Sequence, residues 1–243
     1  MPAPANLYKK TMFNKYEQKK KITFFFNKIY HKLFSEKFNK VLDLKFDNYS
    51  RLDLIKHLIK KKKMNNYLEI GCDQNQVFNN ILVKNKIGVD PYSGGNFRGT
   101  SDDFFKQNKL NFDCIFIDGL HEYEQVIKDI KNSLNFLQAD GYLVLHDCLP
   151  RKLSAQLVPR CRYKWNGDVW KAIVEVRTWD TCETITCLID EGVSIIQKKK
   201  NTDLLLIGDK KDFKKLRFSF FYEKYEDIMR VKNYRDTLNF LGV

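Results

Sequence analysis

The chain has 243 residues, of which 43% are hydrophobic and 30% charged, a balance that excludes a disordered or fibrous chain and predicts one globular domain with additions at its ends. No apolar run is long enough to cross a bilayer, no signal pattern opens the chain, and six scattered cysteines lack the spacing of a zinc site, so we expect a cytoplasmic protein with reduced thiols. The net charge of +13 is uneven, because residues 1–63 hold 17 basic and five acidic side chains, whereas the other 180 residues hold 26 and 25.

The basic N-terminal region predicts two helices. Residues 1–21 are polar and basic and predict a mobile or loosely packed start. From Ile22 to Phe38 apolar residues recur every three or four positions, which predicts a helix with one face in a core. A second helix is predicted from Arg51 to Lys63, where the terminal lysines suit a helix C-terminus. The charge indicates either a contact with phosphate, nucleic acid or an anionic membrane, or a solvated face, and the helical spacing of the aromatic residues favours the solvated face.

After residue 63 the pattern changes to strands that alternate with helices. Short apolar runs ending in polar or acidic residues lie at Tyr67 to Gly71, Lys86 to Asp90, Phe112 to Asp118 and Gly141 to Asp147. The segments between these runs are long enough for helices, and Glu122 to Leu137 has the clearest apolar stripe. The alternation predicts an α/β fold with a parallel sheet and right-handed crossovers.

The last third of the chain predicts a helix from Asp168 to Trp179. A hairpin follows, formed by Ile185 to Ile189 and Val193 to Gln197. The tail predicts one more strand from Leu204 and a final helix from Tyr222 to Leu241.

Two strand ends are typical of a site for a nucleotide-like ligand. The first strand ends at Glu69 to Gly71, and glycine allows the backbone to approach a ligand closely. The second strand ends in Asp90 about twenty residues later, the spacing at which a carboxylate can accept ribose hydroxyls. No Gly-x-Gly-x-x-Gly loop follows the first strand, which disfavours a dinucleotide oxidoreductase.

A set of motifs resembles, in order and spacing, those of the Rossmann-type S-adenosylmethionine-dependent methyltransferases, most closely a bacterial group that includes sugar and macrolide O-methyltransferases. The motifs are Glu69-Ile70-Gly71, Gly88-Val89-Asp90-Pro91, Thr100-Ser101-Asp102, Phe116 to His121 and Gly141 to Asp147, followed by Trp165 to Lys171. The family commonly has a further glycine in its first loop, where this chain has Asn75. Asparagine tolerates left-handed backbone angles better than most residues.

The resemblance implies a Rossmann-like, mostly parallel seven-stranded sheet with helices on both faces and a terminal antiparallel hairpin. It implies a methyltransferase domain over residues 64–200. The resemblance does not extend to the two ends, where charge and apolar spacing predict a basic helical extension over 1–63 and a strand and helix extension of the same domain over 201–243. The implied cofactor is S-adenosylmethionine. The residues placed around it are Glu69 and Gly71 at the methionine part, Asp90 at the ribose, Ser101 and Asp102 near the adenine, and Asp118 beside the methyl donor.

Four polar residues follow the fourth and fifth predicted strands and should open into the same crevice: Asp118, His121, His146 and Asp147. Methyl transfer to a hydroxyl needs a proton acceptor, and we predict His121 as the base, with Asp118 and His146 as further catalytic residues. Metal-assisted relatives imply a Mg or Mn site at Asp118, His146 and Asp147. The structural alternative is that the carboxylates cap helices and the imidazoles only pack.

Trp165 and Asp168 are predicted acceptor-site residues, because their segment combines indole, amide, carboxylate and ammonium groups. The alternative is a helix start with Trp170 in the core. The predicted reaction is O-methylation of a small, glycan-like acceptor. Two alternatives stay open: methylation of RNA or another polyanion docked on the basic region, and a scaffold that binds the cofactor without catalysis. The sequence leaves the oligomeric state open.

Overall fold

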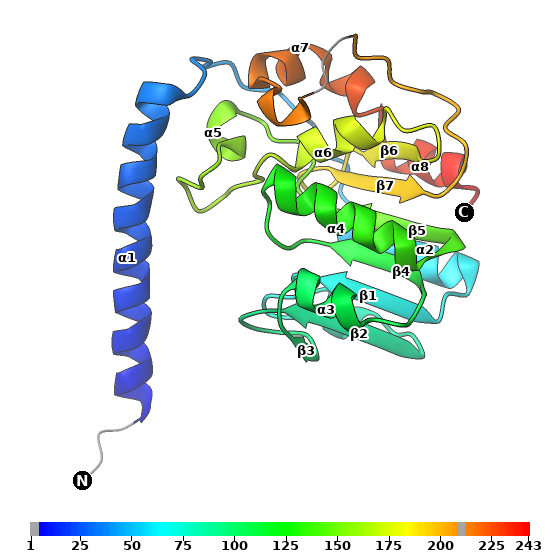
Figure 1. Cartoon of the computed structure of the whole chain (residues 1–243), viewed down its shortest axis with the longest axis horizontal. Helices are drawn as coiled ribbons and strands as arrows, with labels where there is room; N and C mark the ends of the chain where they lie inside the picture. The colour runs from blue at the N-terminus through cyan, green and yellow to red at the C-terminus, as the bar shows by residue number, and fades with distance from the viewer. Residues whose placement is uncertain (1–4, 209–211) are drawn as a thin grey trace.

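The computed structural model describes residues 5–208 and 212–243, with side chains from residue 18 onward. Its centre is one sheet with the strand order β3-β2-β1-β4-β5-β7-β6-β8 (Figure 1). β7 runs antiparallel to β5 and β6, and every other pair is parallel. The strands are β1 (Asn66–Ile70), β2 (Asn85–Asp90), β3 (Phe97–Arg98), β4 (Phe112–Ile117), β5 (Leu137–Leu145), β6 (Glu183–Cys187), β7 (Val193–Gln197) and β8 (Val231–Lys232).

The predicted fold class is confirmed, with eight strands in place of seven. The sequence pattern missed the two-residue strands β3 and β8, which are too short to show a period. The strand predicted from Leu204 is wrong. Leu204 and Leu206 are exposed, and their segment forms no strand.

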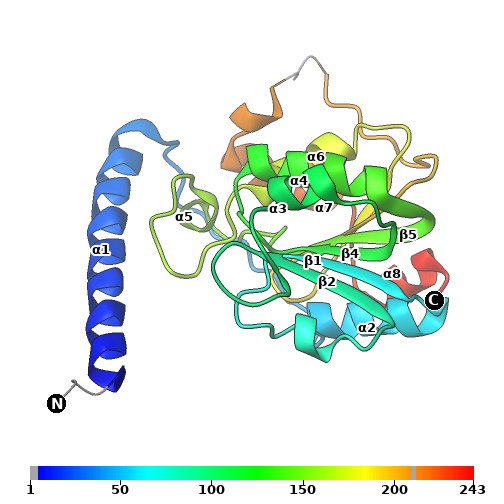
Figure 2. The ribbon, with the colours of Figure 1, turned by 60° about the horizontal axis from the view of Figure 1, so that its bottom comes forward.

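Helices cover both faces of the sheet, as predicted (Figure 2). One face carries α3 (Ser101–Gln107), α4 (Tyr123–Phe136), α6 (Val169–Val176) and α7 (Phe218–Ile228), and the other carries α2 (Arg51–Lys62) and α8 (Tyr234–Leu241). The remaining helices are α1 (Ala5–Phe34), α5 (Leu153–Gln156) and the short 3-10 helices η1 (Phe78–Asn80) and η2 (Phe213–Lys215). The predicted boundaries at residues 63 and 200 stay predictions.

Two hydrophobic cores lie on either side of the sheet because successive strand residues point to opposite faces. In β4, Ile115 and Ile117 belong to the core under α4, whereas Cys114 and Phe116 belong to the core over α2. Each such side chain contributes roughly 1.5–3 kcal/mol by leaving water. All six cysteines are free and buried. Among the described residues, no helix combines the length and apolar character needed to span a bilayer.

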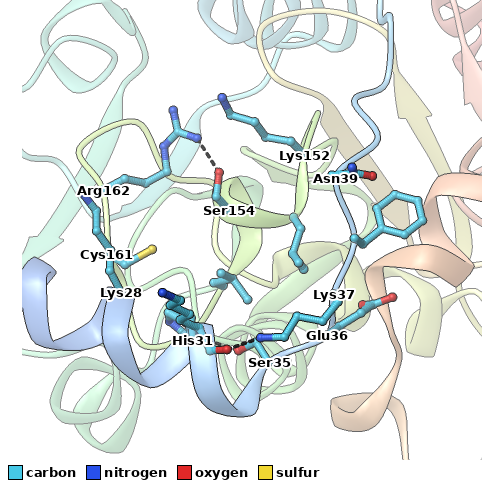
Figure 3. A pocket seen from close by; sticks show the side chains of 14 residues that line it. Lys28, His31, Ser35, Glu36, Lys37, Asn39, Lys152, Ser154, Cys161 and Arg162 are labelled. Carbon is cyan, nitrogen blue, oxygen red and sulfur yellow. Dashed lines mark hydrogen bonds between the residues drawn. The ribbon is translucent and has the colours of Figure 1, made fainter.

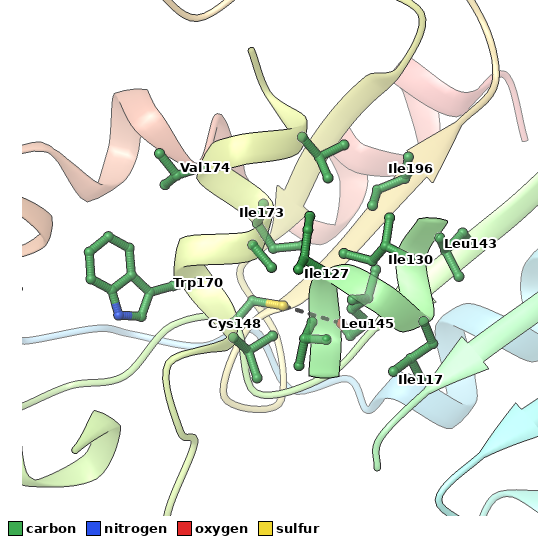
Figure 4. Packing of buried hydrophobic residues seen from close by; sticks show 14 of the residues in the cluster. Ile117, Ile127, Ile130, Leu143, Leu145, Cys148, Trp170, Ile173, Val174 and Ile196 are labelled. Atoms are coloured by element: carbon green, nitrogen blue, oxygen red, sulfur yellow. Dashed lines mark hydrogen bonds between the residues drawn. The ribbon is translucent and has the colours of Figure 1, made fainter. Parts of the chain in front are cut away.

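The helix predicted from Glu122 to Leu137 is confirmed as α4. Its apolar stripe packs on α6 and the strands, where Ile127 and Ile130 lie among Ile117, Leu145 and Ile173 (Figure 4). The same core holds Trp170 of α6, which is fully buried, so the alternative that placed this indole in the core is correct. The predicted hairpin is also confirmed as β6 and β7.

The predicted second helix is confirmed as α2, which begins with a capping box. The Ser50 side chain accepts a hydrogen bond from the Asp53 backbone N–H, and the Asp53 carboxylate accepts one from the Ser50 backbone N–H. Lys63 ends the helix in the left-handed conformation. The buried face of α2 packs on the sheet, which places Arg51 at the same sheet edge as the ends of β4 and β5.

The prediction for the N-terminal helix is wrong in its limits and its packing. The helix α1 begins at Ala5 and ends at Phe34, so most of the segment predicted as loosely packed is helical, and residues 1–4 lie outside the described residues. Its apolar stripe is exposed, and the helix contacts the body through Phe24, Asn27 and His31 instead. Periodicity predicted an apolar face correctly but could not show whether anything covers it.

The predicted final helix is interrupted. Arg230 takes a left-handed conformation (φ 49°), and Val231–Lys232 then pairs with Thr186 and Cys187 as β8. Asn233 starts α8 by accepting a hydrogen bond from Asp236. The tail therefore contains two helices separated by an edge strand.

Candidate active site

The ends of β1 and β4 touch at Gly71. This residue has φ +85°, and a Cβ atom added to it would lie 2.3 Å from the backbone oxygen of Asp118. The Asp118 backbone N–H also donates to the Ile70 oxygen at 2.8 Å. Only glycine fits this position, since it needs both a left-handed backbone and a close approach to another chain segment.

Glu69 is a buried carboxylate on β1 whose hydrogen-bond donors are neutral. The Tyr67 hydroxyl donates to Glu69 at 2.6 Å, and no cationic side chain among the described residues forms an ion pair with it. Burial raises the pKa of Glu69 to about 7, with the Tyr67 hydroxyl opposing the shift and the charge of Asp118 adding to it. A bound cation would compensate this carboxylate.

Asp90 joins the loops that follow β1 and β2. One carboxylate oxygen accepts from the backbone N–H groups of Cys72 and Asp73, and the other accepts from Tyr92 and Ser93. Burial would raise the pKa of Asp90, but these four N–H groups lower it below its ordinary value. A carboxylate has about four acceptor positions, so a ribose hydroxyl would have to replace one of these donors. The sequence did not reveal that Asp90 also holds the two loops together through these hydrogen bonds.

The loop that follows β1 contains Asn75, the residue that stands where the family commonly has a glycine. Asn75 takes the left-handed conformation (φ 63°) that its identity allows, and its side chain accepts from the Gly95 backbone N–H at 2.6 Å. The alternation of strands and helices predicts a helix between β1 and β2, but the described segment forms only the 3-10 turn Phe78–Asn80 there. Val77 and Phe78 of this segment pack into the core over α2.

The two residues predicted near the adenine lie at the start of α3. Ser101 is buried and its hydroxyl donates to Asp129 at 2.6 Å. The Asp102 carboxylate pairs with Lys128 at 2.5 Å. Both side chains therefore have partners within the protein, and their predicted contact with the cofactor stays a prediction.

The structure brings together the four polar residues that follow β4 and β5, named here the base cluster: Asp118, His121, His146 and Asp147. His121 lies between two carboxylates, with Nε2 3.1 Å from Asp118 and Nδ1 3.3 Å from Asp147. His146 Nδ1 lies 3.3 Å from Asp118 and 3.4 Å from Asp147. The cluster is adjacent to Gly71 because Asp118 belongs to both contacts.

Sequence reasoning missed two members of this neighbourhood, Arg51 and Asp190. The Arg51 guanidinium lies 3.6 Å from Asp118 and 2.8 Å from Asp190, and Asp190 lies 3.5 Å from His146 Nε2. The residues come from the N-terminal region and from the hairpin turn, far apart in the sequence. The one signal in the sequence is Asp190-Glu191-Gly192, which connects the two strands of the predicted hairpin and by itself indicates only a turn.

In the base cluster, neighbouring charges shift the pKa of each group more than burial does. Burial would raise the pKa of Asp118, but the two imidazoles hold it well below the ordinary range. Burial would lower the pKa of both imidazoles, but the carboxylates raise the pKa of His121 and raise that of His146 further. Asp118 and Asp147 therefore make His121 a stronger proton acceptor than a free imidazole.

Several residues of the site hold left-handed backbone angles that are rare outside glycine. They are Asp147 (φ 60°) in the cluster, Asp190 (φ 42°) and Glu191 (φ 62°) in the hairpin turn, and Asp73 (φ 43°) after β1. Each costs about 1–2 kcal/mol relative to an ordinary conformation. Strain of this kind gathers where side-chain placement matters more than local stability.

The turn at Trp165 lies directly on His121. The two rings stack with centroids 5.7 Å apart, and Gly167 packs against the His121 backbone so closely that no Cβ atom would fit. Asn166 donates to Asp147 at 2.7 Å. The Asp168 carboxylate accepts from the Tyr123 backbone N–H and pairs with Lys171. Trp165 thus adjoins the base cluster, whereas both oxygens of Asp168 have structural partners.

The base cluster also fits a divalent ion. Asp118, His121 and Asp147 offer one ligand atom each within 4.8 Å of one another. Nδ1 of His121 and Nδ1 of His146 are buried without a well-formed hydrogen bond. The raised pKa values of His121 and His146 mean that an ion would bind in competition with protons. Once both imidazoles are neutral, three carboxylates face one guanidinium, that of Arg51, and a charge of +2 balances them. The carboxylates suit Mg and Mn, whereas an imidazole is a softer ligand than either ion prefers.

One family model matches the part of the chain that contains these strand ends. Residues 68–148 match the family model described as a methyltransferase domain. The matched segment runs from β1 past the end of β5 and includes every member of the base cluster. The resemblance predicted from the motifs is confirmed for this methyltransferase domain, and the narrower likeness to sugar and macrolide enzymes stays a prediction. No curated protein matches the chain.

The solved structures that are similar to the chain include the following three. The methyltransferase PaMTH1 of Podospora anserina, bound to S-adenosylhomocysteine, is 17% identical, with 62% of this chain and 78% of that chain covered and a TM-score of 0.49. An O-methyltransferase of Bacillus cereus in complex with the same compound is 9% identical (65% and 84%, TM-score 0.46). The O-methyltransferase TomG of Streptomyces achromogenes, in complex with S-adenosylmethionine, is 12% identical (70% and 86%, TM-score 0.46). Similarity at this level identifies neither an acceptor nor a metal.

Proposed function

We propose that the chain binds S-adenosylmethionine and transfers its methyl group to an oxygen of a small, glycan-like acceptor. The observation that carries the proposal is the contact between Gly71 and Asp118. It brings the end of β1, where the methionine part would lie, next to the base cluster at the end of β4. In open α/β sheets, ligands bind at this carboxyl edge.

The residues of the cluster can supply the proton transfer. When bound, S-adenosylmethionine offers an electrophilic methyl group on a positively charged sulfur. His121 accepts the proton of the acceptor hydroxyl as the oxygen–carbon bond forms and the carbon–sulfur bond breaks. Asp118 and Asp147 orient the imidazole and stabilise its charge, and Trp165 closes one side of it. Alignment of the acceptor with the departing sulfur provides the rest of the acceleration.

Glu69 favours this cofactor, since no cationic side chain of the described residues forms an ion pair with its buried carboxylate, and S-adenosylmethionine carries both an ammonium and a sulfonium group. The cation favours the ionised carboxylate. Because the pKa of Glu69 in the cofactor-free protein is about 7, the affinity for S-adenosylmethionine should be highest above that pH. Below it, the affinity should fall by up to about tenfold per pH unit. Titrations between pH 5.5 and 8.5 test this. Glu69→Gln should bind weakly with no pH dependence, and an equal pH profile in both proteins would contradict the assignment.

The second part of the proposal is that the base cluster binds a divalent ion. We propose Asp118 and Asp147 as its carboxylate ligands, with one imidazole as the third. The sequence resemblance implied His146 for this place, and the geometry favours His121. A nitrogen that holds a metal cannot also accept a proton, so the identity of the imidazole decides whether His121 remains free as the base. An ion there would acidify the acceptor hydroxyl.

Metal binding is measurable without an acceptor. We expect millimolar Mn to raise the Tm of the wild type by several degrees and Asp118→Asn to abolish the rise, whereas Asp102→Asn, outside the cluster, keeps it. His121→Gln and His146→Gln, tested side by side, identify the third ligand by loss of the same rise. An unchanged wild-type Tm with both Mn and Mg would remove the metal from the proposal.

The reaction itself is tested by transfer of a labelled methyl group to a panel of hydroxyl compounds that includes sugars, nucleotide sugars and phenols. We expect label in a small hydroxyl acceptor. Label in RNA alone would favour the polyanion alternative, and cofactor binding without label in any acceptor would favour the scaffold.

A further inference from the structure

The long helix α1 exposes an apolar stripe to solvent. Its residues recur at intervals of three and four, and each is more than two-fifths exposed: Ile22, Phe25, Phe26, Ile29, Tyr30, Leu33 and Phe34. The helix stands beside the sheet domain and projects away from it (Figures 1 and 2). Exposed apolar stripes of this size mark a surface that another body covers.

Lysines accompany this stripe. The sequence of α1 contains eight lysines and one glutamate, and Lys21, Lys28 and Lys32 recur at helical spacing beside the stripe. A second copy of the chain would bring two such lysine-rich helices together with almost no carboxylates between them. Like charges in that position disfavour pairing, whereas an anionic surface complements them.

A cavity of about 880 Å³ lies between α1 and the segment 152–162 (Figure 3). Its cationic side chains are those of Lys28, Lys32, Lys37, Lys152 and Arg162. Its one carboxylate, Glu36, accepts hydrogen bonds from the backbone N–H groups of Phe218 and Ser219. The cavity therefore offers excess positive charge for a phosphate group.

We propose that α1 lies on the surface of a membrane that contains anionic phospholipids. The apolar stripe enters the boundary between head groups and acyl chains, the flanking lysines contact the head groups, and the cavity can take the phosphate of one of them. A helix with one apolar face and a lysine-rich remainder is typical of binding in the plane of a membrane surface. RNA is less suited as the occupant, because aliphatic residues such as Ile29 and Leu33 cannot stack on bases.

The test uses the full chain and sedimentation with vesicles of phosphatidylcholine alone or with about 30% phosphatidylserine. We expect binding only to the anionic vesicles, weakened in high salt and unaffected by millimolar inorganic phosphate. The double variant Phe25→Asp with Leu33→Asp should reduce the partition coefficient at least about tenfold. Leu82→Asp, which changes a still more exposed leucine outside α1, should bind as the wild type does.

The unfolding temperature of each variant shows whether the fold is intact. Three results would overturn the proposal: no binding to anionic vesicles, equal binding of the double variant, or binding to a labelled RNA in place of vesicles. Sedimentation velocity tests whether a second copy of the chain covers the stripe instead. If the wild type is a dimer that does not bind vesicles, and the double variant is a monomer, the stripe is a dimer interface and the membrane proposal is wrong.

Discussion

Replacement of His121 by glutamine is expected to lower kcat between about 100-fold and 10,000-fold while leaving the affinity for S-adenosylmethionine unchanged. Glutamine keeps a polar side chain near Asp118 and Asp147 but cannot accept a proton. The loss should appear in kcat and not in KM, because the imidazole acts as the acceptor oxygen is deprotonated. The measurement is methyl transfer to whichever hydroxyl compound the wild type methylates.

His57→Gln is the matched control for this experiment, since His57 lies on α2 outside the base cluster. It should keep wild-type kcat. A His121→Gln variant that folds, binds the cofactor and retains more than about a third of wild-type kcat would remove His121 as the base.

Gly71→Ala is expected to lower the free energy of unfolding by about 3 kcal/mol and to weaken cofactor binding at least tenfold. The added Cβ atom would lie 2.3 Å from a backbone oxygen of Asp118, and alanine disfavours a φ of +85°. The strand ends must then separate, which moves Glu69 away from the base cluster. Denaturant unfolding and calorimetric titration measure the two effects.

Gly119→Ala is a stringent control because it adds the same methyl group one residue beyond Asp118. Its Cβ atom would lie 3.4 Å from the nearest atom, a side-chain carbon of Ile70. We expect a change within about 1 kcal/mol. Equal losses in the two alanine variants would contradict the special role of the contact at Gly71.

The sequence predicted the central fold well because, in the sheet domain, the periodic apolar residues are the ones that the fold buries. The strands that contain Glu69, Asp90 and Ile117 lie where short apolar runs end in polar residues, and α4 lies where its stripe repeats. Elements of two residues, β3 and β8, are below the length at which a period can be read. The C-terminal segment differs from its prediction for the same reason, because the short strand Val231–Lys232 divides the predicted final helix into two.

The candidate site could be predicted only in part. Asp118, His121, His146 and Asp147 follow neighbouring strands, and parallel strands deliver their ends to one edge. Arg51 joins them from a helix whose packing no local pattern specifies, and it arrives with Asp190. The four backbone donors to Asp90 and the exposure of α1 depend on tertiary contacts.

Calorimetric titration of the purified chain with S-adenosylmethionine and S-adenosylhomocysteine, with NAD as the control, tests the central claim most directly. The account predicts micromolar binding of both sulfur compounds, at least tenfold weaker binding in Gly71→Ala, and no heat from NAD. Absence of binding by either sulfur compound to a folded wild-type protein would contradict the proposed function and leave only the fold.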